Sequence, residues 1–146
     1  MSDFPSTGRL IGVDHGTARV GLAVCDVEQR VASPLDTYRR RDPVQDTRYF
    51  IQLATEYGAV GWVIGLPMHM SGAEGGQAKG CREFGAGLSA ATSLPVVYHD
   101  ERYTSAVADE SMALARLTPQ QRKDRRDRVA AALILQGFLD ATLQAS

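Results

Sequence analysis

The sequence is poor in cysteine and contains no long apolar run. Cys25 and Cys81 are its two cysteines, too few for a disulfide framework or a zinc site. No apolar stretch approaches the roughly 20 residues that a helix needs to cross a bilayer. The first residues, MSDFPSTG, lack the basic and then apolar pattern of a secretory signal. These absences predict a cytoplasmic protein that has no membrane partner.

A large excess of charge of either sign is also absent, but the positive charge is unevenly spread. The net charge is −1, and 14 of the 16 basic residues are arginine, which binds phosphate in a bidentate manner better than lysine. Two segments, YRRRDP and RKDRRDR, concentrate these charges. Either segment alone is most simply a solvated surface, but two of them in a near-neutral chain predict a local nucleic-acid-binding surface. Its basic residues are Arg39, Arg40, Arg41, Arg122, Lys123, Arg125, Arg126 and Arg128.

Length and composition favour one globular domain. A chain of 146 residues with 44% hydrophobic residues suits a single core. We expect residues 1–8 to form a disordered lead and residues 9–143 to form the domain. Two apolar runs joined by Gly16-Thr17 predict a β-hairpin over about 9–25. The segment RVASPLDTYR predicts a third strand, which Pro34 confines to a sheet edge or a bulge.

Helices and strands alternate in the rest of the chain. Asp42-Pro43 predicts the start of a helix that Gly58 ends. The segments AVGWVIGLP and LPVVYHDE are typical of buried strands, and a weaker helix lies between them. The predicted order β-β-β-α-β-α-β-α indicates an α/β fold with a mixed five-stranded sheet flanked by helices.

The helical region after the last strand, the final position of this order, is expected to consist of two helices. Thr104 is a suitable cap for a helix that runs to about Leu117. Thr118-Pro119 then predicts a short turn, and the basic segment leads into a last helix from about Asp127 to Leu143.

Acidic residues stand at the predicted strand ends. Asp14 ends the first strand, although aspartate avoids strand interiors and a buried carboxylate needs a partner. Asp100 and Glu101 end the last strand. If these two strands run side by side in parallel, their carboxyl ends lie at one edge of the sheet, where open α/β sheets bind ligands.

A third acid is expected to face the same sheet. Ala131, Ile134 and Phe138 follow Asp127 at helical spacing, which places Asp127 on the apolar face of the last helix. Three carboxylates at one edge repel one another unless a divalent cation such as Mg²⁺ or Mn²⁺ binds between them. One or two such ions activate water in phosphodiester cleavage. The alternative is that Asp14 only caps the Gly16-Thr17 turn.

Four segments resemble a known family. The segments GVDHGTARVGLAV, VIGLPMHMSGAEG, VVYHDERYT and RRDRVAAALILQGFLD have the order and spacing of the YqgF/RuvX-type family of Holliday-junction-resolvase-like proteins. The resemblance extends over about residues 9–142 and implies a three-layer, ribonuclease-H-like fold. It also implies a small metal-dependent nuclease. Members are described as trimming the 5′ end of pre-16S ribosomal RNA, and some as acting on branched DNA.

The resemblance implies roles for particular residues. Asp14 matches the metal ligand of the first strand, Glu101 the second acid and Asp127 the acid of the last helix, with Asp100 as a neighbouring candidate. The matching basic and polar positions are Arg19, Arg102 and Thr104.

The chain departs from the family pattern at three positions. His69 and Ser71 stand where asparagine and aspartate are usual, and Ala18 replaces a usual lysine. The departures remove side chains that could contact substrate, but none of them changes the three acids.

Other functions remain open at the level of sequence. The segment VDHGT also resembles the first phosphate loop of actin-like and sugar-kinase ATPases, but these enzymes need two such domains. A Holliday-junction resolvase is the second nuclease alternative, and cutting two opposed strands calls for a homodimer. The third alternative is a nucleic-acid-binding module without catalysis.

Overall fold

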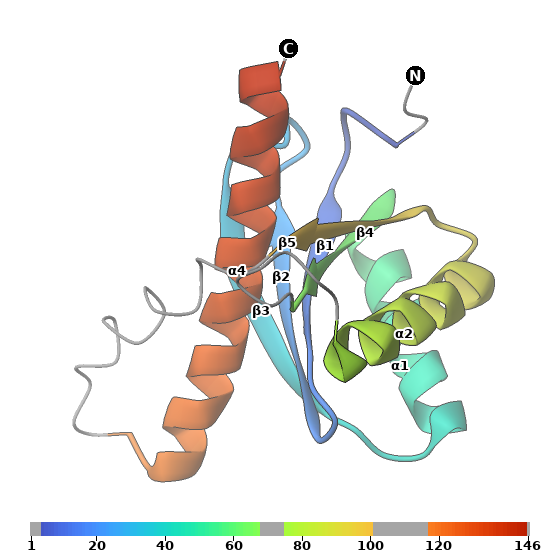
Figure 1. Cartoon of the computed structure of the whole chain (residues 1–146), viewed down its shortest axis with the longest axis vertical. Helices are drawn as coiled ribbons and strands as arrows, with labels where there is room; N and C mark the ends of the chain where they lie inside the picture. The colour runs from blue at the N-terminus through green and yellow to red at the C-terminus, as the bar shows by residue number, and fades with distance from the viewer. Residues whose placement is uncertain (1–3, 68–74, 101–116, 146) are drawn as a thin grey trace.

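The computed structural model describes residues 4–67, 75–100 and 117–145, which form three layers (Figure 1). A five-stranded sheet in the order β3-β2-β1-β4-β5 is the central layer. Helices α1 and α2 pack on one face of the sheet, and α4 packs on the other. The predicted fold, a mixed five-stranded sheet flanked by helices, is confirmed.

The first three strands form an antiparallel meander. Pro34 lies on the edge strand, beside a register shift between Leu22 and Ala23, so this strand combines the predicted edge position with the predicted bulge. The strands are β1 (Leu10–His15), β2 (Arg19–Cys25) and β3 (Ala32–Arg39).

The second half of the sheet is parallel. β4 lies between β1 and β5 and pairs in parallel with both, so the first and last strands are not direct neighbours. Their carboxyl ends nevertheless lie at the same edge of the sheet. The elements are α1 (Pro43–Tyr57), β4 (Gly61–Leu66), α2 (Gly76–Thr92) and β5 (Val96–Asp100).

Helix α1 begins and ends at the residues that its sequence predicts. The Asp42 side chain accepts a hydrogen bond of 2.8 Å from the Gln45 amide, and Pro43 occupies the first turn. Gly58 ends the helix with a φ of 59°, a left-handed conformation that glycine adopts without steric cost.

Helix α4 (Pro119–Ala145) begins about two turns before the predicted start at Asp127. Thr118 and Gln121 form a reciprocal cap. The Thr118 hydroxyl accepts from the Gln121 amide at 3.1 Å, and the Gln121 side chain accepts from the Thr118 amide at 2.9 Å. Thr118-Pro119 is therefore a helix start rather than a free turn, and the basic segment lies inside the helix.

Residues 4–8, expected to belong to a disordered lead, contact the domain. The Phe4 ring lies edge-on to Phe138 at 5.6 Å between ring centres, and the Gly8 amide donates to the Val27 carbonyl at 2.7 Å. The predicted helix from Thr104 and the glycine-rich segment 68–74 lie outside the described residues. Within the described part of the chain, no helix combines the length and the apolar character needed to cross a membrane.

Candidate active site

Asp14 lies on the face of the sheet that α4 covers. A Cβ atom added at Gly12 would lie 2.7 Å from the Leu135 Cβ, so position 12 points at α4. Side chains two residues apart in a strand point to the same face. Asp14 therefore faces the α4 layer, and it is partly buried there.

A glycine brings Asp127 close to Asp14. Gly21 is the cross-strand partner of Asp14, and a Cβ atom added at Gly21 would collide with the Asp127 carbonyl oxygen. The α4 backbone thus lies directly on β2 at the position beside Asp14. A glycine in the middle of a strand often indicates such a close approach, and the segment RVGLAV contains this signal.

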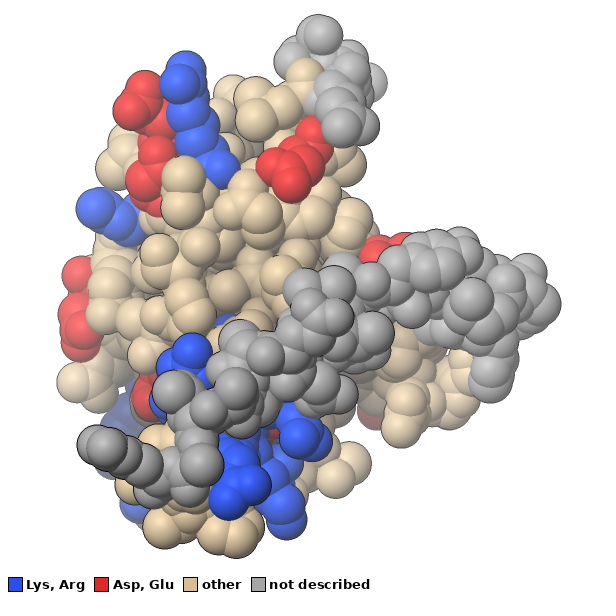
Figure 2. Space-filling view, turned by 90° about the vertical axis from the view of Figure 1, so that its left-hand side faces the viewer, with Lys and Arg blue, Asp and Glu red and all other residues tan. Residues whose placement is uncertain are grey.

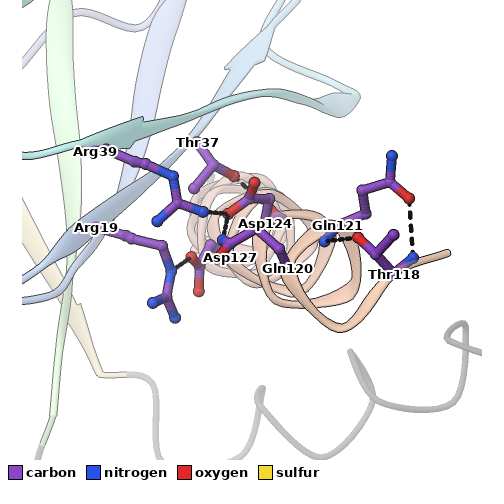
Figure 3. A network of polar contacts seen from close by, with 8 residues as sticks. All are labelled: Arg19, Thr37, Arg39, Thr118, Gln120, Gln121, Asp124 and Asp127. Carbon is purple, nitrogen blue, oxygen red and sulfur yellow. Dashed lines mark hydrogen bonds and ion pairs between the residues drawn. The ribbon is translucent and has the colours of Figure 1, made fainter.

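The Asp127 carboxylate points to the sheet and pairs with Arg19 on β2 (Figure 3). The Arg19 Nε lies 2.6 Å from the Asp127 Oδ2, and the two side chains are 28% and 18% exposed. The hydrogen bond to Asp127 raises the pKa of Arg19. The apolar neighbours predicted for Asp127 are also in place, because Ala131 and Ile134 are buried against the sheet.

A second ion pair lies one helical turn earlier. The Arg39 guanidinium lies 2.7 Å from the Asp124 carboxylate, and the Thr37 hydroxyl donates to the Asp124 carbonyl (Figure 3). The sequence analysis does not predict a role for Asp124. Its spacing of three residues from Asp127 is the signal, because this spacing places both acids on neighbouring parts of one helical face. Arg39 is thus engaged with α4.

Arg40 stabilises the turn that follows Asp14. Its guanidinium contacts the His15 Nε2 at 3.1 Å and donates to the Gly16 carbonyl at 3.3 Å. It also lies 3.5 Å from the Asp46 carboxylate and over the Phe84 ring. Burial, together with the positive charge of Arg40, lowers the pKa of His15. The predicted run of three arginines therefore does not form one uniform surface.

Asp100 lies on the opposite face from Asp14. It pairs in register with Leu66, which is buried on the α1 and α2 side of the sheet. His99 faces α4, since a Cβ atom at Gly137 would lie 2.9 Å from its Nε2, and burial lowers its pKa. This alternation places His99 and Asp100 on opposite faces of β5. The predicted positions Glu101, Arg102 and Thr104 lie outside the described residues, as do the departures at His69 and Ser71.

The two acids on the α4 face fit part of a divalent-metal site. Asp14 and Asp127 provide carboxylate oxygens, which suit Mg²⁺ and Mn²⁺. Among the described residues, no three His, Cys, Asp or Glu side chains form a cluster that could hold a metal ion. A three-acid site therefore needs Glu101, which follows β5 in the sequence and lies outside the described residues.

The amino-terminal half of α4 carries the second basic segment. In Figure 2, blue side chains gather at the lower end of the visible face, where this part of α4 lies. The Arg122 Nε donates to the Leu117 carbonyl at 3.2 Å. Arg122, Lys123 and Arg126 are exposed, whereas Arg125 and Arg128 are partly buried.

Solved structures share this fold. The chain aligns with Thermus thermophilus RuvC in complex with a Holliday junction substrate at a TM-score of 0.57 and 14% identity, over 95% of this chain and 98% of that one. It aligns with the Fowlpox virus resolvase, in complex with Holliday junction DNA, at a TM-score of 0.56 and 9% identity. That match covers 92% of this chain and 99% of the resolvase. At these identities the likeness shows the fold alone.

Other proteins are much more similar to this chain in sequence than these solved structures are. A Rhodopirellula baltica protein named "Putative pre-16S rRNA nuclease" is 42% identical over 138 residues, which cover 94% of this chain and 80% of the relative. A Methylocella silvestris protein of the same name is 42% identical over 132 residues, covering 90% of this chain and 82% of the relative. The family model RuvX, described as Holliday junction resolvase, matches residues 8–141. With this match over nearly the whole chain, the protein belongs to the RuvX family.

Proposed function

We propose that this chain is a nuclease that hydrolyses phosphodiester bonds in the maturation of the 5′ end of pre-16S rRNA, in the cytoplasm. The observation that carries the proposal is the placement of Asp14 and Asp127 on one face of the sheet, beside Gly21. The names of the relatives at 42% identity support ribosomal RNA as the substrate.

The proposed catalytic residues are Asp14, Glu101 and Asp127, which would together hold Mg²⁺ or Mn²⁺. A bound ion would supply an activated water and offset the negative charge that develops on the phosphate. Strand β1 fixes the position of Asp14, and Arg19 holds the Asp127 carboxylate toward the sheet. The geometry does not favour Asp100 as a ligand, because it lies on the other face.

The proposed nucleic-acid surface is the amino-terminal half of α4 together with Arg41. Its exposed side chains carry positive charge, and such contacts bind the phosphate backbone largely without reading sequence. Arg19, Arg39 and Arg40 have carboxylate partners within the fold, so we assign them first to positioning.

The test is a cleavage assay with two substrates. The purified protein is incubated with a labelled fragment of pre-16S rRNA or with a synthetic four-way DNA junction, in Mg²⁺, Mn²⁺ or EDTA. We expect cleavage of the RNA that EDTA abolishes and that Asp14→Asn lowers by at least about a hundredfold, the scale expected for loss of a catalytic group. Asp100→Asn is the matched control and should retain most of the activity.

The other outcomes separate the alternatives. Paired symmetric cuts in the junction, made by a two-fold dimer, would replace this proposal with the resolvase that the family description names. Tight, salt-sensitive binding of RNA without metal-dependent cleavage would instead indicate a binding module. Full activity of Asp127→Asn would contradict the three-acid site.

A further inference from the structure

A hollow of about 460 Å³ lies outside the candidate active site, where β3 leads into α1. Among the described residues, its lining combines aromatic, amide and guanidinium groups, and the nearest carboxylates are those that bind the two tyrosine hydroxyls. The lining residues are Tyr38, Arg41, Gln45, Arg48, Tyr49 and Gln52.

Two tyrosines form a fixed aromatic wall of the hollow. The Tyr38 and Tyr49 rings stack at 4.0 Å between centres with an angle of 17°. The Tyr38 hydroxyl donates to Asp46 at 2.7 Å, and the Tyr49 hydroxyl donates to Asp36 at 2.6 Å. Because both hydroxyls are hydrogen-bonded to carboxylates, the rings are already ordered and can stack with a ligand at little further cost in conformational entropy.

Two arginines line the hollow. Arg41 and Arg48 are exposed, and within the described residues neither guanidinium forms an ion pair. Arg48 shares one face of α1 with Gln45 and Gln52, at a spacing of three and four residues. Guanidinium groups bind phosphate, and side-chain amides can both donate to and accept from the edge of a base.

The hollow lies toward the same edge of the sheet as the candidate active site. Arg41 follows Arg40 directly, and Arg40 donates to the carbonyl of Gly16, two residues after Asp14. The carboxyl end of β3 lies at the same edge of the sheet as that of β1, since both strands run antiparallel to β2. Asp14 faces α4 and the hollow lies on the α1 side, so a strand bound near Asp14 reaches the hollow by crossing this edge of the sheet.

We propose that this hollow binds one nucleotide of single-stranded RNA that flanks the cleaved bond, with its base against the tyrosine pair and its phosphate between Arg41 and Arg48. The inference rests on the proposed function for the identity of the substrate. It adds a site to that function, because the chemistry proposed for Asp14, Glu101 and Asp127 does not involve the two tyrosines.

The test measures the binding of a fluorescein-labelled single-stranded RNA of about 12 nucleotides by anisotropy, at several salt concentrations. All proteins carry Asp14→Asn so that the RNA stays intact. We expect Arg41→Gln with Arg48→Gln to weaken binding about tenfold and to reduce the slope of log K against log salt by about 1.4, as for two phosphate contacts on a single strand. The matched control is Arg9→Gln with Arg30→Gln, which removes the same charge from exposed positions at the opposite edge of the sheet.

A second variant tests the aromatic wall separately. Tyr49→Leu should weaken binding about tenfold without changing the salt slope, because stacking releases no counterions. Circular dichroism checks that the variant is folded, and Tyr49→Phe, which keeps the ring, should bind like the unmodified protein.

The failure of this inference is distinguishable from the failure of the proposed function. If the Arg41→Gln, Arg48→Gln protein binds RNA as tightly as the protein without these changes, the hollow is not an RNA site even though the protein binds RNA. The same conclusion follows if the control variant loses as much affinity as this one. If the protein with Arg41 and Arg48 intact binds no single-stranded RNA and leaves pre-16S rRNA uncut, the proposed function fails and the inference fails with it.

Discussion

The arginines near the candidate active site differ in what their guanidinium groups contact. Arg19 pairs with Asp127 at 2.6 Å, Arg39 pairs with Asp124 at 2.7 Å, and Arg40 holds the turn after Asp14. A charge-assisted hydrogen bond fixes both the position and the direction of a carboxylate. The chemistry proposed for Asp127 therefore depends on Arg19, even if Arg19 never contacts substrate.

Replacing Arg19 with glutamine should slow cleavage about 10-fold to 100-fold at saturating RNA, the usual effect of removing a group that orients a metal ligand. The reason is that Asp127 loses its partner on β2. Single-turnover cleavage measured over a range of Mn²⁺ concentrations checks the rate and the apparent metal affinity together.

Arg39→Gln is the control for this prediction, because it removes the neighbouring ion pair from the same helix. It should change the rate at saturating RNA by less than about threefold, as expected for an exposed ion pair that orients no proposed ligand. Equal losses in the two variants would mean that Arg19 acts through the general stability of the contact between α4 and the sheet.

At the scale of elements, the contact between α4 and the sheet depends on small residues. Gly12 and Gly21 lie under the α4 backbone, and there is no room for a Cβ atom at either position. Leu135 and Ala131 bury the adjoining surface. Close backbone packing thus sets the distance of Asp127 from the strand that carries Asp14.

Gly21→Ala should destabilise the protein by about 1–3 kcal/mol and lower cleavage, because the added methyl group pushes α4 away from β2. Thermal unfolding and the cleavage rate measure the two effects. Gly87→Ala is the control: its Cβ meets no atom within 4 Å, and alanine favours a helix, so it should be neutral or stabilising. A Gly21→Ala protein with unchanged stability would contradict the close packing.

The junction between β3 and α1 is held by a buried carboxylate. Asp46 accepts hydrogen bonds from the Tyr38 hydroxyl at 2.7 Å and from the Arg41 amide at 2.8 Å. Burial alone would raise the pKa of Asp46, but these bonds and the contact with Arg40 outweigh it and leave the pKa below its usual 3.8. The same burial and the bond to Asp46 raise the pKa of Tyr38 to about 12.

Asp46→Asn should cost about 2 kcal/mol of unfolding free energy at pH 7, because hydrogen bonds to a charged acceptor are lost. A carboxyl group whose pKa is lowered by folding stabilises the protein above its unfolded pKa and loses that contribution as pH falls through its folded pKa. The difference from the unmodified protein should therefore shrink between pH 4 and pH 2. Urea unfolding of both proteins across this range measures it, and a constant difference would contradict the ionised state of Asp46.

At the scale of the whole molecule, the charge is nearly balanced but unevenly distributed over the described surface. The net charge is −1, yet exposed basic residues gather on the amino-terminal half of α4 (Figure 2). Such a surface attracts a polyanion at close range, and salt screens the attraction.

Arg122→Gln with Lys123→Gln should weaken RNA binding about equally for unrelated sequences and reduce the salt slope by about 1 to 2, because contacts to the phosphate backbone do not depend on the bases. The cleavage rate at saturating RNA should stay within about twofold. Fluorescence anisotropy with two unrelated RNA sequences checks this prediction, and a loss confined to one sequence would refute it.

The sequence by itself determined most elements of the described residues and the face of α4 that is buried against the sheet. Asp42 and Gly58 mark the ends of α1, Pro34 marks the edge strand, and the alternation of strands and helices predicts the mixed sheet, because these signals act through local backbone conformation and periodicity. Helical spacing likewise places Asp127 among buried residues. The predicted start of the last helix at Asp127 is wrong, although the Thr118–Gln121 cap that begins α4 is also a local signal.

Only the tertiary structure decided which of these groups meet. Strand order placed β4 between β1 and β5, and the packing of α4 on Gly21 brought Asp127 beside Asp14. The tertiary structure also places Arg39 against α4, Arg40 at the turn after Asp14, and Arg41 at the hollow beside α1. Local propensity contains no information on such contacts, because they join residues up to 108 positions apart and depend on the space left between packed layers.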